Sequence, residues 1–283
     1  MQVDHLHFFT DLRCRGRNIM SNLSSFDLTG KRAIVTGGSR GLGSGSAEGL
    51  MEAGASVAIF GTSETVYKKA DEFNRKGYPC KGYIADLSDR KKRKDVFEEA
   101  VRDLGGLDII IQAAGIQRRH PVPDFPLEDW YEVLEVNLTA VFDLSQMAIR
   151  EFLKKDWVPG NPSRGKIINY ASVCSFFGGY TIPAYSAAKG GVMQLTKDLC
   201  NEVTSKGINV NAVAPGYMET RMNTAFFEDP SYKERYNNIT SRIPAGRWGT
   251  PDDMKGITCF LSSSASDYLS GCIIPVDGGY LVR

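Results

Sequence analysis

The stretch Lys31-Arg-Ala-Ile-Val-Thr-Gly-Gly-Ser-Arg-Gly-Leu-Gly43 decides the fold of this chain. It begins as a short apolar run, typical of a buried strand, and continues into glycines at 37, 41 and 43. A helix is expected from 41 to 53, so the glycines connect a strand to a helix. There the backbone turns sharply and can approach a phosphate, whose charge is favoured by the helix N-terminus. The stretch therefore predicts a nucleotide-binding turn rather than a plain tight turn.

Strand and helix patterns alternate along the rest of the chain. Apolar runs predict strands at 31–36, 56–60, 83–85, 107–111, 166–170, 208–213 and 272–276, and helices are expected at 41–53, 64–76, 89–103, 127–154, 184–205 and 251–262. Apolar strands separated by helices are typical of a parallel sheet that is covered on each side. We therefore expect an α/β fold, a single doubly wound parallel-sheet (Rossmann) domain of about seven strands with helices on both faces. Such a domain binds its ligands at the carboxyl ends of the strands.

No linker divides this pattern, so residues 25–283 are expected to form one domain. Residues 216–246 interrupt the alternation after the sixth strand and are expected to form a substrate loop. Residues 1–24 contain several arginines and aspartates but no apolar segment, which argues against a secretory signal. We expect this N-terminal extension to be disordered.

The composition excludes several classes of protein. The 283 residues carry a formal net charge of +1, whereas nucleic-acid binders usually show a basic excess. No apolar run approaches the roughly 18 residues of a transmembrane helix. The six cysteines form no C-x-x-C pair and the three histidines are scattered, so no metal site is expected. These features favour a reduced, cytoplasmic protein that acts on a small molecule, without nucleic-acid or membrane partners.

The end of the second expected strand distinguishes between dinucleotides. NAD sites place an acid there to bind the ribose 2′-hydroxyl. Here the strand ends Phe60-Gly-Thr-Ser63 without an acid, and Arg40 in the glycine turn can pair with a 2′-phosphate. This pattern favours NADP(H), while the nearby Glu64 keeps NAD(H) as the alternative. The cofactor-binding residues expected from these two segments are Gly37, Ser39, Arg40, Gly41, Leu42, Gly43, Thr62 and Ser63.

Tyr185 and Lys189 form a Y-x-x-x-K pattern that places both side chains on one face of the helix expected at 184–205. An ammonium beside a phenol favours the phenolate. We therefore expect the pKa of Tyr185 to be lowered towards neutrality, as suits acid/base chemistry on a carbonyl/alcohol pair. Ser172 follows the fifth strand and can reach the same carbonyl oxygen. Asn137, within the long helix at 127–154, can hold a water on the path to Lys189, although alone it would be interpreted as a surface residue.

Together these residues resemble the short-chain dehydrogenase/reductase family over residues 24–283. The pattern consists of T-G-x-x-x-G-x-G at 36–43, Asp86, Asn137, Ser172, Tyr185, Lys189, and Pro215-Gly216 with Thr220. The resemblance implies that Tyr185 donates and accepts the proton and that Ser172 polarises the carbonyl. It implies that Lys189 lowers the tyrosine pKa and binds the nicotinamide ribose, and that Asn137 supports a proton relay.

The resemblance also implies a cofactor path and a homotetrameric assembly. Asp86 and Leu87 would border the adenine and Thr220 would meet the carboxamide. Tyr185, Lys189, Ala114, Gly115, Pro215 and Gly216 complete the expected cofactor-binding set. One segment departs from the family pattern, because N-N-A-G is here Gln112-Ala-Ala-Gly115. The change puts local packing in doubt, but we do not expect it to abolish cofactor binding.

Further stretches resemble a narrower branch that acts on sugar acids. Residues 114–121 are similar to gluconate 5-dehydrogenases, and residues 243–249, 263–268 and 276–279 are similar to those enzymes and to 2-deoxy-D-gluconate 3-dehydrogenases. Arg118 and Arg119 follow the fourth strand, where either can clamp a carboxylate, with a solvated or subunit-interface pair as the alternative. His120 can contact a hydroxyl, and Tyr217 is expected beside the nicotinamide. The expected substrate residues are Arg118, Arg119, His120, Ser172, Tyr185 and Tyr217.

The favoured function is therefore NAD(P)(H)-dependent interconversion of a ketone and a secondary alcohol, on a gluconate-type keto-sugar acid. Phe176, Phe177 and Tyr180 give the site an aromatic side, which suits a fatty-acyl, polyketide or secondary-metabolite ketone as the alternative. A non-catalytic NADP-binding regulator is the third hypothesis, against which the intact catalytic pattern argues. Arg247 and Trp248 are expected to be structural or to lie at a subunit contact.

Overall fold

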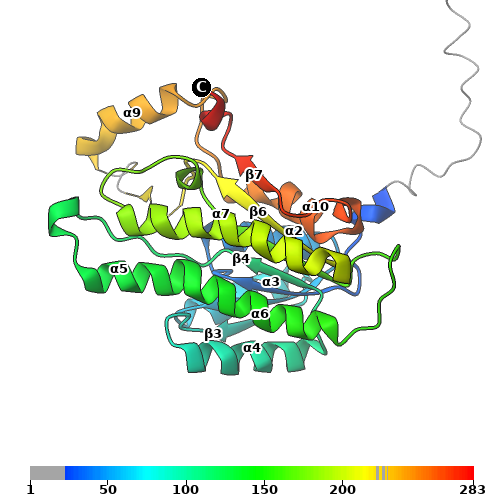
Figure 1. The fold of residues 1–283 in the computed structure, drawn as a ribbon. Coiled ribbons are helices and arrows are strands. Elements are labelled where there is room, and N and C mark those ends of the chain that lie inside the picture. Colours follow the sequence, from blue (N-terminus) through cyan, green and yellow to red (C-terminus); the bar gives the residue numbers. More distant parts are fainter. Residues whose placement is uncertain (1–22, 221–222, 225–226, 228) are drawn as a thin grey trace, which may run out of the picture.

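The computed structural model describes residues 23–220, 223–224, 227 and 229–283 (Figure 1). Most of the extension expected at 1–24, including its expected disorder, lies outside the described residues. A small part of the expected substrate loop at 216–246 lies outside them as well.

The described chain folds around one seven-stranded sheet. Its strands, in spatial order, are β3 (Cys80–Ile84), β2 (Ser56–Gly61), β1 (Arg32–Thr36), β4 (Ile109–Gln112), β5 (Gly165–Tyr170), β6 (Ile208–Pro215) and β7 (Ile273–Val276). Every neighbouring pair is parallel. The strand order reverses direction between β1 and β4, which is the position where doubly wound sheets bind ligands. The expected fold class is confirmed.

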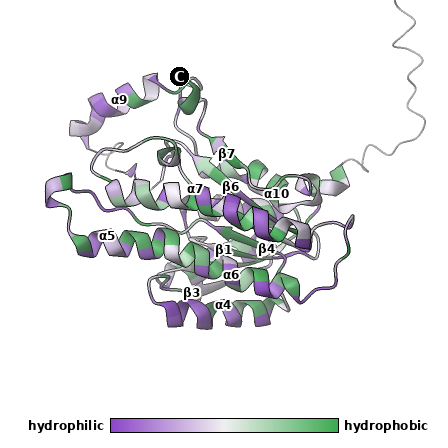
Figure 2. Cartoon of the chain, in the orientation of Figure 1, coloured by the Kyte–Doolittle hydropathy of each residue, from purple (hydrophilic) through white to green (hydrophobic). Residues whose placement is uncertain are grey.

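Two helical layers cover the sheet (Figure 1). Helices α2 (Gly41–Glu52), α3 (Thr65–Arg75) and α10 (Lys255–Ser262) bury apolar side chains against one face. Helices α4 (Arg90–Leu104), α6 (Ala140–Leu153) and α7 (Pro183–Val203) do the same on the other face. Figure 2 shows hydropathy in keeping with this arrangement, since the outward side of α4 is hydrophilic. Within the described ranges, no helix is both long enough and apolar enough to cross a bilayer.

Three expected boundaries were wrong. Strand β3 begins at Cys80 rather than at 83, because an edge strand exposes one face and its polar Lys81 weakens the apolar pattern. Strand β4 lies at 109–112 rather than at 107–111. The long helix expected at 127–154 is divided into α5 (Leu127–Leu134), a π-helical turn at Glu135–Thr139, and α6. A π turn has no simple periodic signature, so hydrophobic spacing did not indicate it.

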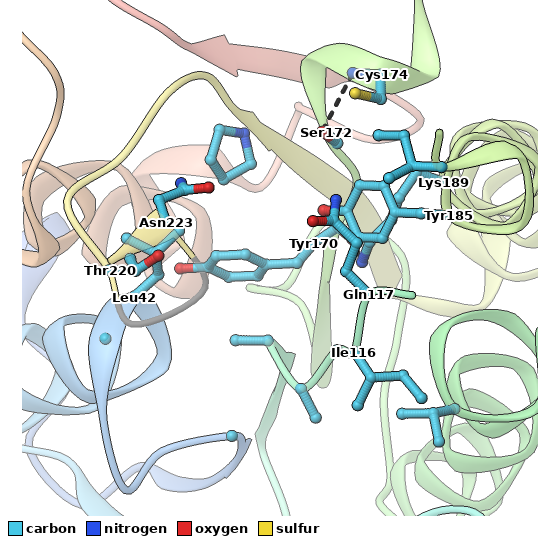
Figure 3. A pocket seen from close by; sticks show the side chains of 18 of the residues that line it. Leu42, Ile116, Gln117, Tyr170, Ser172, Cys174, Tyr185, Lys189, Thr220 and Asn223 are labelled. Carbon is cyan, nitrogen blue, oxygen red and sulfur yellow. Dashed lines mark hydrogen bonds between the residues drawn. The ribbon is translucent and has the colours of Figure 1, made fainter. Parts of the chain in front are cut away.

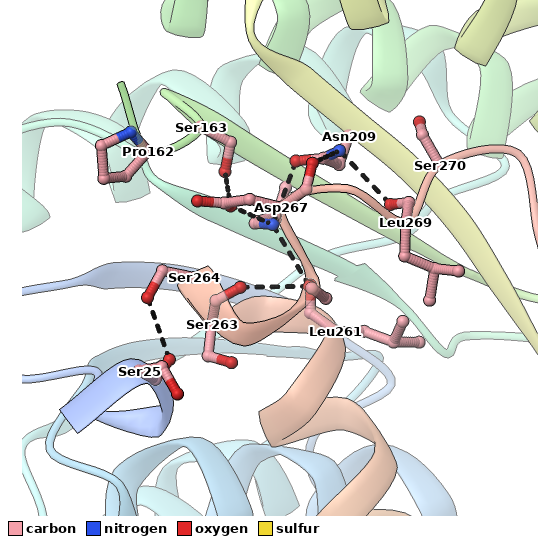
Figure 4. Close-up of polar contacts among 12 residues, drawn as sticks. Ser25, Pro162, Ser163, Asn209, Leu261, Ser263, Ser264, Asp267, Leu269 and Ser270 are labelled. Carbon is pink, nitrogen blue, oxygen red and sulfur yellow. Dashed lines mark hydrogen bonds and ion pairs between the residues drawn. The ribbon is translucent and has the colours of Figure 1, made fainter. Parts of the chain in front are cut away.

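Polar contacts fasten the last part of the chain to the amino ends of β5 and β6 (Figure 4). Asp267 accepts hydrogen bonds from Ser163 Oγ at 2.9 Å and from the buried Lys166 Nζ at 2.7 Å. Lys166 Nζ also donates to Asn209 Oδ1 at 3.0 Å, so neighbouring groups satisfy its charge. This cluster lies at the edge opposite to the strand ends that carry the expected site residues.

A second charged cluster joins the starts of β1 and β4. Asp108 accepts hydrogen bonds from the backbone N–H of Arg32 at 3.0 Å, from Arg32 Nε at 2.7 Å and from Lys155 Nζ at 2.5 Å. Burial opposes ionisation of Asp108, but the bonds from Arg32 and Lys155 outweigh it and lower its pKa to about 2. The carboxylate thus holds two strands and the segment after α6 together.

Asp108→Ala is expected to lower the free energy of unfolding by about 3 kcal/mol at neutral pH, because it leaves two partly buried cations unpaired. The folded-state pKa is depressed, so the unfolded chain binds more protons. The stabilisation is therefore present above pH 4 and declines as the pH falls towards 2. Urea titrations at pH 7 and pH 3 should show a wild-type to variant difference that shrinks at the lower pH. The exposed Asp71→Ala variant is the control, and an equal effect of both substitutions would contradict the assignment.

Candidate active site

One large cleft lies at the carboxyl ends of the strands, where the strand order reverses between β1 and β4. It has a volume of ≈ 1340 Å³. Its lining includes nearly all expected cofactor and substrate residues: Gly37, Ser39, Arg40, Gly41, Leu42, Gly43, Thr62, Asp86, Leu87, Ala114, Gly115, Arg118, Arg119, His120, Ser172, Tyr185, Lys189, Pro215, Gly216, Tyr217 and Thr220. Ser63 lies outside the lining, and its hydroxyl is 2.9 Å from that of Thr65. Residues as distant in the sequence as Gly37 and Thr220 are therefore brought to one edge of the sheet.

The glycine turn is shaped by close backbone packing. Gly37 has a φ of 67°, and a Cβ there would lie 2.9 Å from Ala114 Cα, so a side chain would collide with the end of β4. A Cβ on Gly43 would lie 2.4 Å from Gly37 O. The turn therefore presents bare backbone and the N-terminus of α2 to the cleft. This cradle and the volume of the cleft fit a dinucleotide.

The end of β2 presents polar but not acidic groups to the cleft. Thr62 and Arg40 both line it, and the exposed Arg40 forms the N-cap of α2. Glu64, which kept NAD(H) as an alternative, is the N-cap of α3 and does not belong to the lining. This arrangement fits a 2′-phosphate better than a free 2′-hydroxyl.

A buried arginine that sequence reasoning missed supports the adenine side of the cleft. Arg93 on α4 is 1% exposed and donates to the carbonyl oxygen of Leu87. It also donates to Glu135 Oε1 at 2.9 Å, at the start of the π turn, and to Asp143 Oδ2 at 2.9 Å. Arg93 lies within the basic run Arg90–Lys94, so nothing in the sequence separated it from its solvated neighbours. It joins the loop after β3 to the helix that carries Asn137.

Ser172, Tyr185 and Lys189 meet at the other end of the cleft (Figure 3). Ser172 follows β5, and its Oγ accepts a hydrogen bond from the Cys174 N–H at 3.1 Å. Lys189 lies one helical turn after Tyr185 on α7, with Nζ 5.7 Å from the centre of the Tyr185 ring. Lys189 Nζ donates to the carbonyl oxygen of Tyr170, at the end of β5, at 2.6 Å. The strand end thus fixes the ammonium close to the phenol.

The electrostatics of this group differ from the expectation. Burial raises the pKa of Tyr185 to about 12, against a smaller lowering by a hydrogen bond with Ser172. Burial also lowers the pKa of Lys189 to about 8. The expectation that the pKa of Tyr185 is lowered towards neutrality is therefore wrong. Desolvation of the phenol outweighs the neighbouring charges, and the ammonium donates to Tyr170 rather than to the phenol.

Asn137 lies fully buried in the π turn rather than on the surface. Its Oδ1 accepts from the N–H of Ile116 at 2.9 Å, and its Nδ2 donates to the carbonyl oxygen of the same residue at 2.8 Å. A Cβ on Gly115 would lie 3.2 Å from Asn137 Oδ1 and 3.9 Å from Lys189 Nζ, so the amide and the ammonium border the same space. The amide positions the segment after β4, and its expected role in a water relay stays a prediction.

The unusual Gln112 braces the sheet beneath the site. Gln112 is 1% exposed, and its Nε2 lies 2.7 Å from Ser145 Oγ on α6 and 3.1 Å from Asn169 Oδ1 on β5. Asn169 in turn donates to Thr196 Oγ1 on α7 at 3.0 Å. The amide nitrogen therefore links β4 to its neighbours, whereas Gln112 Oε1 is buried without a hydrogen-bond partner among the described residues.

The arginines after β4 have different surroundings. Arg118 forms an ion pair with Glu132 on α5 at 2.8 Å, and His120 Nε2 lies 2.6 Å from Asp129 Oδ2 on the same helix. These contacts hold the loop against α5. Arg119 is exposed to the cleft, and the ion pairs among the described residues give it no acidic partner. Of the two expected clamps, Arg119 is thus the one whose guanidinium is not engaged by a carboxylate of the described chain.

Aromatic side chains form part of the substrate end. Phe177 and Tyr180 line the cleft, whereas Phe176 does not. Tyr217 packs against Tyr280 and Trp248, with ring centres 5.1 and 5.2 Å apart. Trp248 is 1% exposed, and Arg247 pairs with Asp253 at 2.8 Å, in keeping with the expected structural roles of residues 247 and 248.

Comparison with known proteins agrees with this architecture. The family model described as short chain dehydrogenase matches residues 31–231. The 2-dehydro-3-deoxy-D-gluconate 5-dehydrogenase of Dickeya dadantii (strain 3937) is 42% identical over 264 residues, which cover 92% of this chain and 99% of that protein. The 5-keto-D-gluconate 5-reductase of Escherichia coli (strain K12) is 36% identical, over 91% of this chain and 98% of that protein.

A solved structure gives the same result in three dimensions. The gluconate 5-dehydrogenase from Burkholderia cenocepacia J2315, in complex with NADP and tartrate, superposes with a TM-score of 0.84 and 37% identity. The match covers 93% of this chain and 99% of that one. With the glycine turn, the seven-stranded sheet and the Ser172, Tyr185 and Lys189 arrangement, these matches show that the chain belongs to the short-chain dehydrogenase family.

Proposed function

We propose that this chain interconverts a ketone and a secondary alcohol on a keto-sugar acid, with NADP(H) as the hydride carrier. One observation carries the proposal. A single cleft contains a glycine turn that fits a dinucleotide at one end, and Ser172, Tyr185 and Lys189 at the other. Several relatives are named for activity on gluconate-type acids, which supports a keto-sugar acid as the substrate.

The residues of the cleft suit NADP(H) along its whole length. Bound NADPH would supply the hydride to the carbonyl carbon, and bound NADP⁺ would accept it in the reverse direction. The amides of the glycine turn would hold the pyrophosphate, and Arg40 with Thr62 would hold the 2′-phosphate. Asp86 and Leu87 would border the adenine. Thr220 and Gly115 would lie towards the nicotinamide, next to Lys189.

The chain's own side chains would move the proton. Ser172 would donate a hydrogen bond to the carbonyl oxygen, and the Tyr185 phenol would deliver its proton to that oxygen during reduction. Because burial holds the pKa of Tyr185 at about 12, the phenol is protonated at neutral pH and ready to act as the acid. Lys189 would stabilise the phenolate that remains after transfer. Two further residues would border the substrate. Tyr217 lies in the proposed substrate loop at 216–246, and Arg119 lies in the segment after β4.

A second candidate is the same chemistry on a larger, less polar ketone. The aromatic rings of Phe177 and Tyr180 in the lining favour it. The exposed cationic Arg119 near Tyr185 favours an acidic substrate instead, because an apolar chain would leave that charge without a counter-ion.

The function is tested with a panel of keto-sugar acids and simple ketones, followed at 340 nm with NADPH and with NADH. We expect turnover of a keto-sugar acid such as 5-keto-D-gluconate, with a preference for NADPH. Arg40→Ala should reduce that preference roughly 10- to 100-fold by raising the KM for NADPH alone, because a charge-assisted pair is lost. Turnover confined to ketones without a carboxylate would favour the second candidate. An unchanged cofactor preference in Arg40→Ala would contradict the 2′-phosphate site.

We also propose a cytoplasmic homotetramer. The five cysteines of the described chain are free thiols, as is usual in a reducing compartment. Leu127 and Tyr131, one turn apart on α5, are 62% and 63% exposed and offer an apolar surface to another subunit. A monomeric mass by light scattering would contradict the assembly.

A further inference from the structure

A serine behind the cleft links the two segments that carry the catalytic residues. Ser175 ends the 3₁₀ turn η4 (Val173–Ser175), which begins directly after Ser172. Its Oγ accepts a hydrogen bond from the Ser172 N–H at 3.2 Å and donates one to the carbonyl oxygen of Lys189 on α7 at 2.7 Å. Ser175 is half-buried and does not belong to the lining of the cleft. One hydroxyl therefore joins the backbones of two residues of the active site.

Lys189 is held to the segment after β5 at two points. Its Nζ donates to the carbonyl oxygen of Tyr170 at 2.6 Å, and its own carbonyl oxygen accepts from Ser175 Oγ. The first bond fixes the ammonium against the end of the strand, whereas the second fixes the backbone of α7 against the turn that follows Ser172. Because Tyr185 lies one helical turn before Lys189, the second bond also sets the position of Ser172 relative to the phenol.

The hydroxyl of Ser172 has a restricted orientation (Figure 3). Its oxygen accepts a hydrogen bond from the Cys174 N–H at 3.1 Å, so its proton can be donated to the Tyr185 oxygen or to a substrate carbonyl. The Ser175 N–H closes the turn by donating to the Ser172 carbonyl oxygen at 2.9 Å. A short 3₁₀ turn has hydrogen bonds of poor geometry. Its orientation towards α7 therefore depends on the bond from Ser175 Oγ to that helix.

A second hydroxyl allows positioning of Ser172 to be separated from general bracing of the fold. Thr196 Oγ1 also joins β5 to α7, because it accepts a hydrogen bond from Asn169 Nδ2 at 3.0 Å. Thr196 is fully buried, lies outside the cleft lining and follows Lys189 by about two helical turns. This bond ties the same strand to the same helix, but it involves no catalytic residue.

We propose that Ser175 is a positioning residue for the reaction, which holds the Ser172 hydroxyl within reach of the carbonyl oxygen that Tyr185 protonates. The proposal rests on the proposed function and makes it more specific. Ser175 does not line the cleft, so it acts through Ser172. Without its hydroxyl, the turn loses its bond to α7, and Ser172 and Tyr185 are no longer held together around one oxygen. The loss falls on the transition state, in which Ser172 stabilises the charge on that oxygen.

The first test measures kcat for the ketone of the panel that the wild type reduces fastest. In Ser175→Ala, kcat should fall roughly 10- to 100-fold, because a misplacement of about 1 Å has an effect of this size, while the KM for NADPH stays near its wild-type value. Ser175→Thr keeps a hydroxyl and should recover most of the rate. Thr196→Val is the matched control and should lower the melting temperature without a comparable loss of kcat. A wild-type kcat in Ser175→Ala, or an equal loss in Thr196→Val, would overturn the proposal.

The second test asks whether Ser175 acts through Ser172. Ser172→Ala removes the hydroxyl that is positioned, so adding Ser175→Ala to that variant should lower kcat by a further factor of only about 2 or less. The same 10- to 100-fold loss in both backgrounds would show that Ser175 acts independently of Ser172, and the positioning role would be wrong.

A third measurement does not depend on turnover. Crystal structures with NADP⁺ should show Ser172 Oγ further from Tyr185 Oη in Ser175→Ala than in the wild type, and the wild-type separation in Thr196→Val. An unmoved Ser172 in Ser175→Ala would overturn the proposal. A wild type that reduces no ketone of the panel would contradict the proposed function, and the position of Ser172 in the crystals would still decide the positioning role.

Discussion

Replacing Tyr185 by phenylalanine is expected to lower kcat for ketone reduction roughly 10³- to 10⁴-fold, while the enzyme still binds NADPH. The substitution removes only the hydroxyl that delivers the proton and leaves a ring of nearly the same shape in a half-buried position. The Lys189 ammonium keeps its hydrogen bond to the Tyr170 carbonyl, so the strand end and α7 remain joined. The loss should therefore appear in kcat rather than in the affinity for the cofactor.

The measurement combines single-substrate kinetics with the fluorescence change of NADPH on binding. Tyr67→Phe, on the exposed face of α3 and outside the cleft, is the matched control and should keep wild-type kinetics. Normal turnover in Tyr185→Phe would remove the phenol from the mechanism. Loss of NADPH binding in that variant would instead assign Tyr185 to the cofactor site alone.

The fold was predictable because its strands are buried on both faces. Runs such as Ile109–Ile111 and Ala33–Val35 are almost inaccessible to solvent, so they are apolar throughout and stand out between polar helices. The prediction failed where burial is one-sided, as at the edge strand β3, or where the helical geometry changes, as at the π turn that contains Asn137. The local hydrophobic pattern of a sequence predicts which residues are buried, but it does not predict hydrogen-bond geometry.

The site was predictable to a different degree at its two ends. Glycines 37 and 43 and the Tyr185–Lys189 spacing are imposed by backbone geometry, which a motif captures. Arg118 and Arg119 are adjacent and chemically identical, and the positions of Asp129 and Glu132 on α5 distinguish them. The residues that a substrate meets are thus selected by tertiary contacts that spacing alone does not reveal.

The expected pKa of Tyr185 shows the same limit. The i, i+4 spacing correctly places the ammonium beside the phenol, but it does not show how deeply both groups are buried. Burial disfavours the charged form of each, so it raises the tyrosine pKa and lowers the lysine pKa. The outcome is a phenol that holds its proton at neutral pH, beside an ammonium that loses its own above pH 8.

Because the pKa values of Tyr185 and Lys189 are both shifted, the variant Lys189→Met can test whether the charge of the ammonium matters for catalysis. Lys189 Nζ lies 5.7 Å from the centre of the Tyr185 ring. Two unit charges separated by roughly 5–6 Å interact by about 3 kcal/mol at an effective dielectric constant of about 20, so alcohol oxidation at pH 7 should slow roughly 10²-fold when the ammonium is removed. Oxidation needs the phenolate, which the ammonium favours. The pKa of Lys189 is about 8, so the charge is present below that pH and is lost above it.

The difference between wild type and Lys189→Met should therefore narrow as the pH rises from 7 to 10, because the wild type then loses the same charge by deprotonation. Lys189→Arg retains a cation at every pH, so its rate should exceed that of Lys189→Met by a factor that does not decline. Initial rates of oxidation across this range, with circular dichroism to show that each variant is folded, give the comparison. A constant ratio between wild type and Lys189→Met from pH 7 to pH 10 would show that Lys189 acts by holding Tyr170 and the cofactor in place. A declining ratio would show that its charge sustains the phenolate.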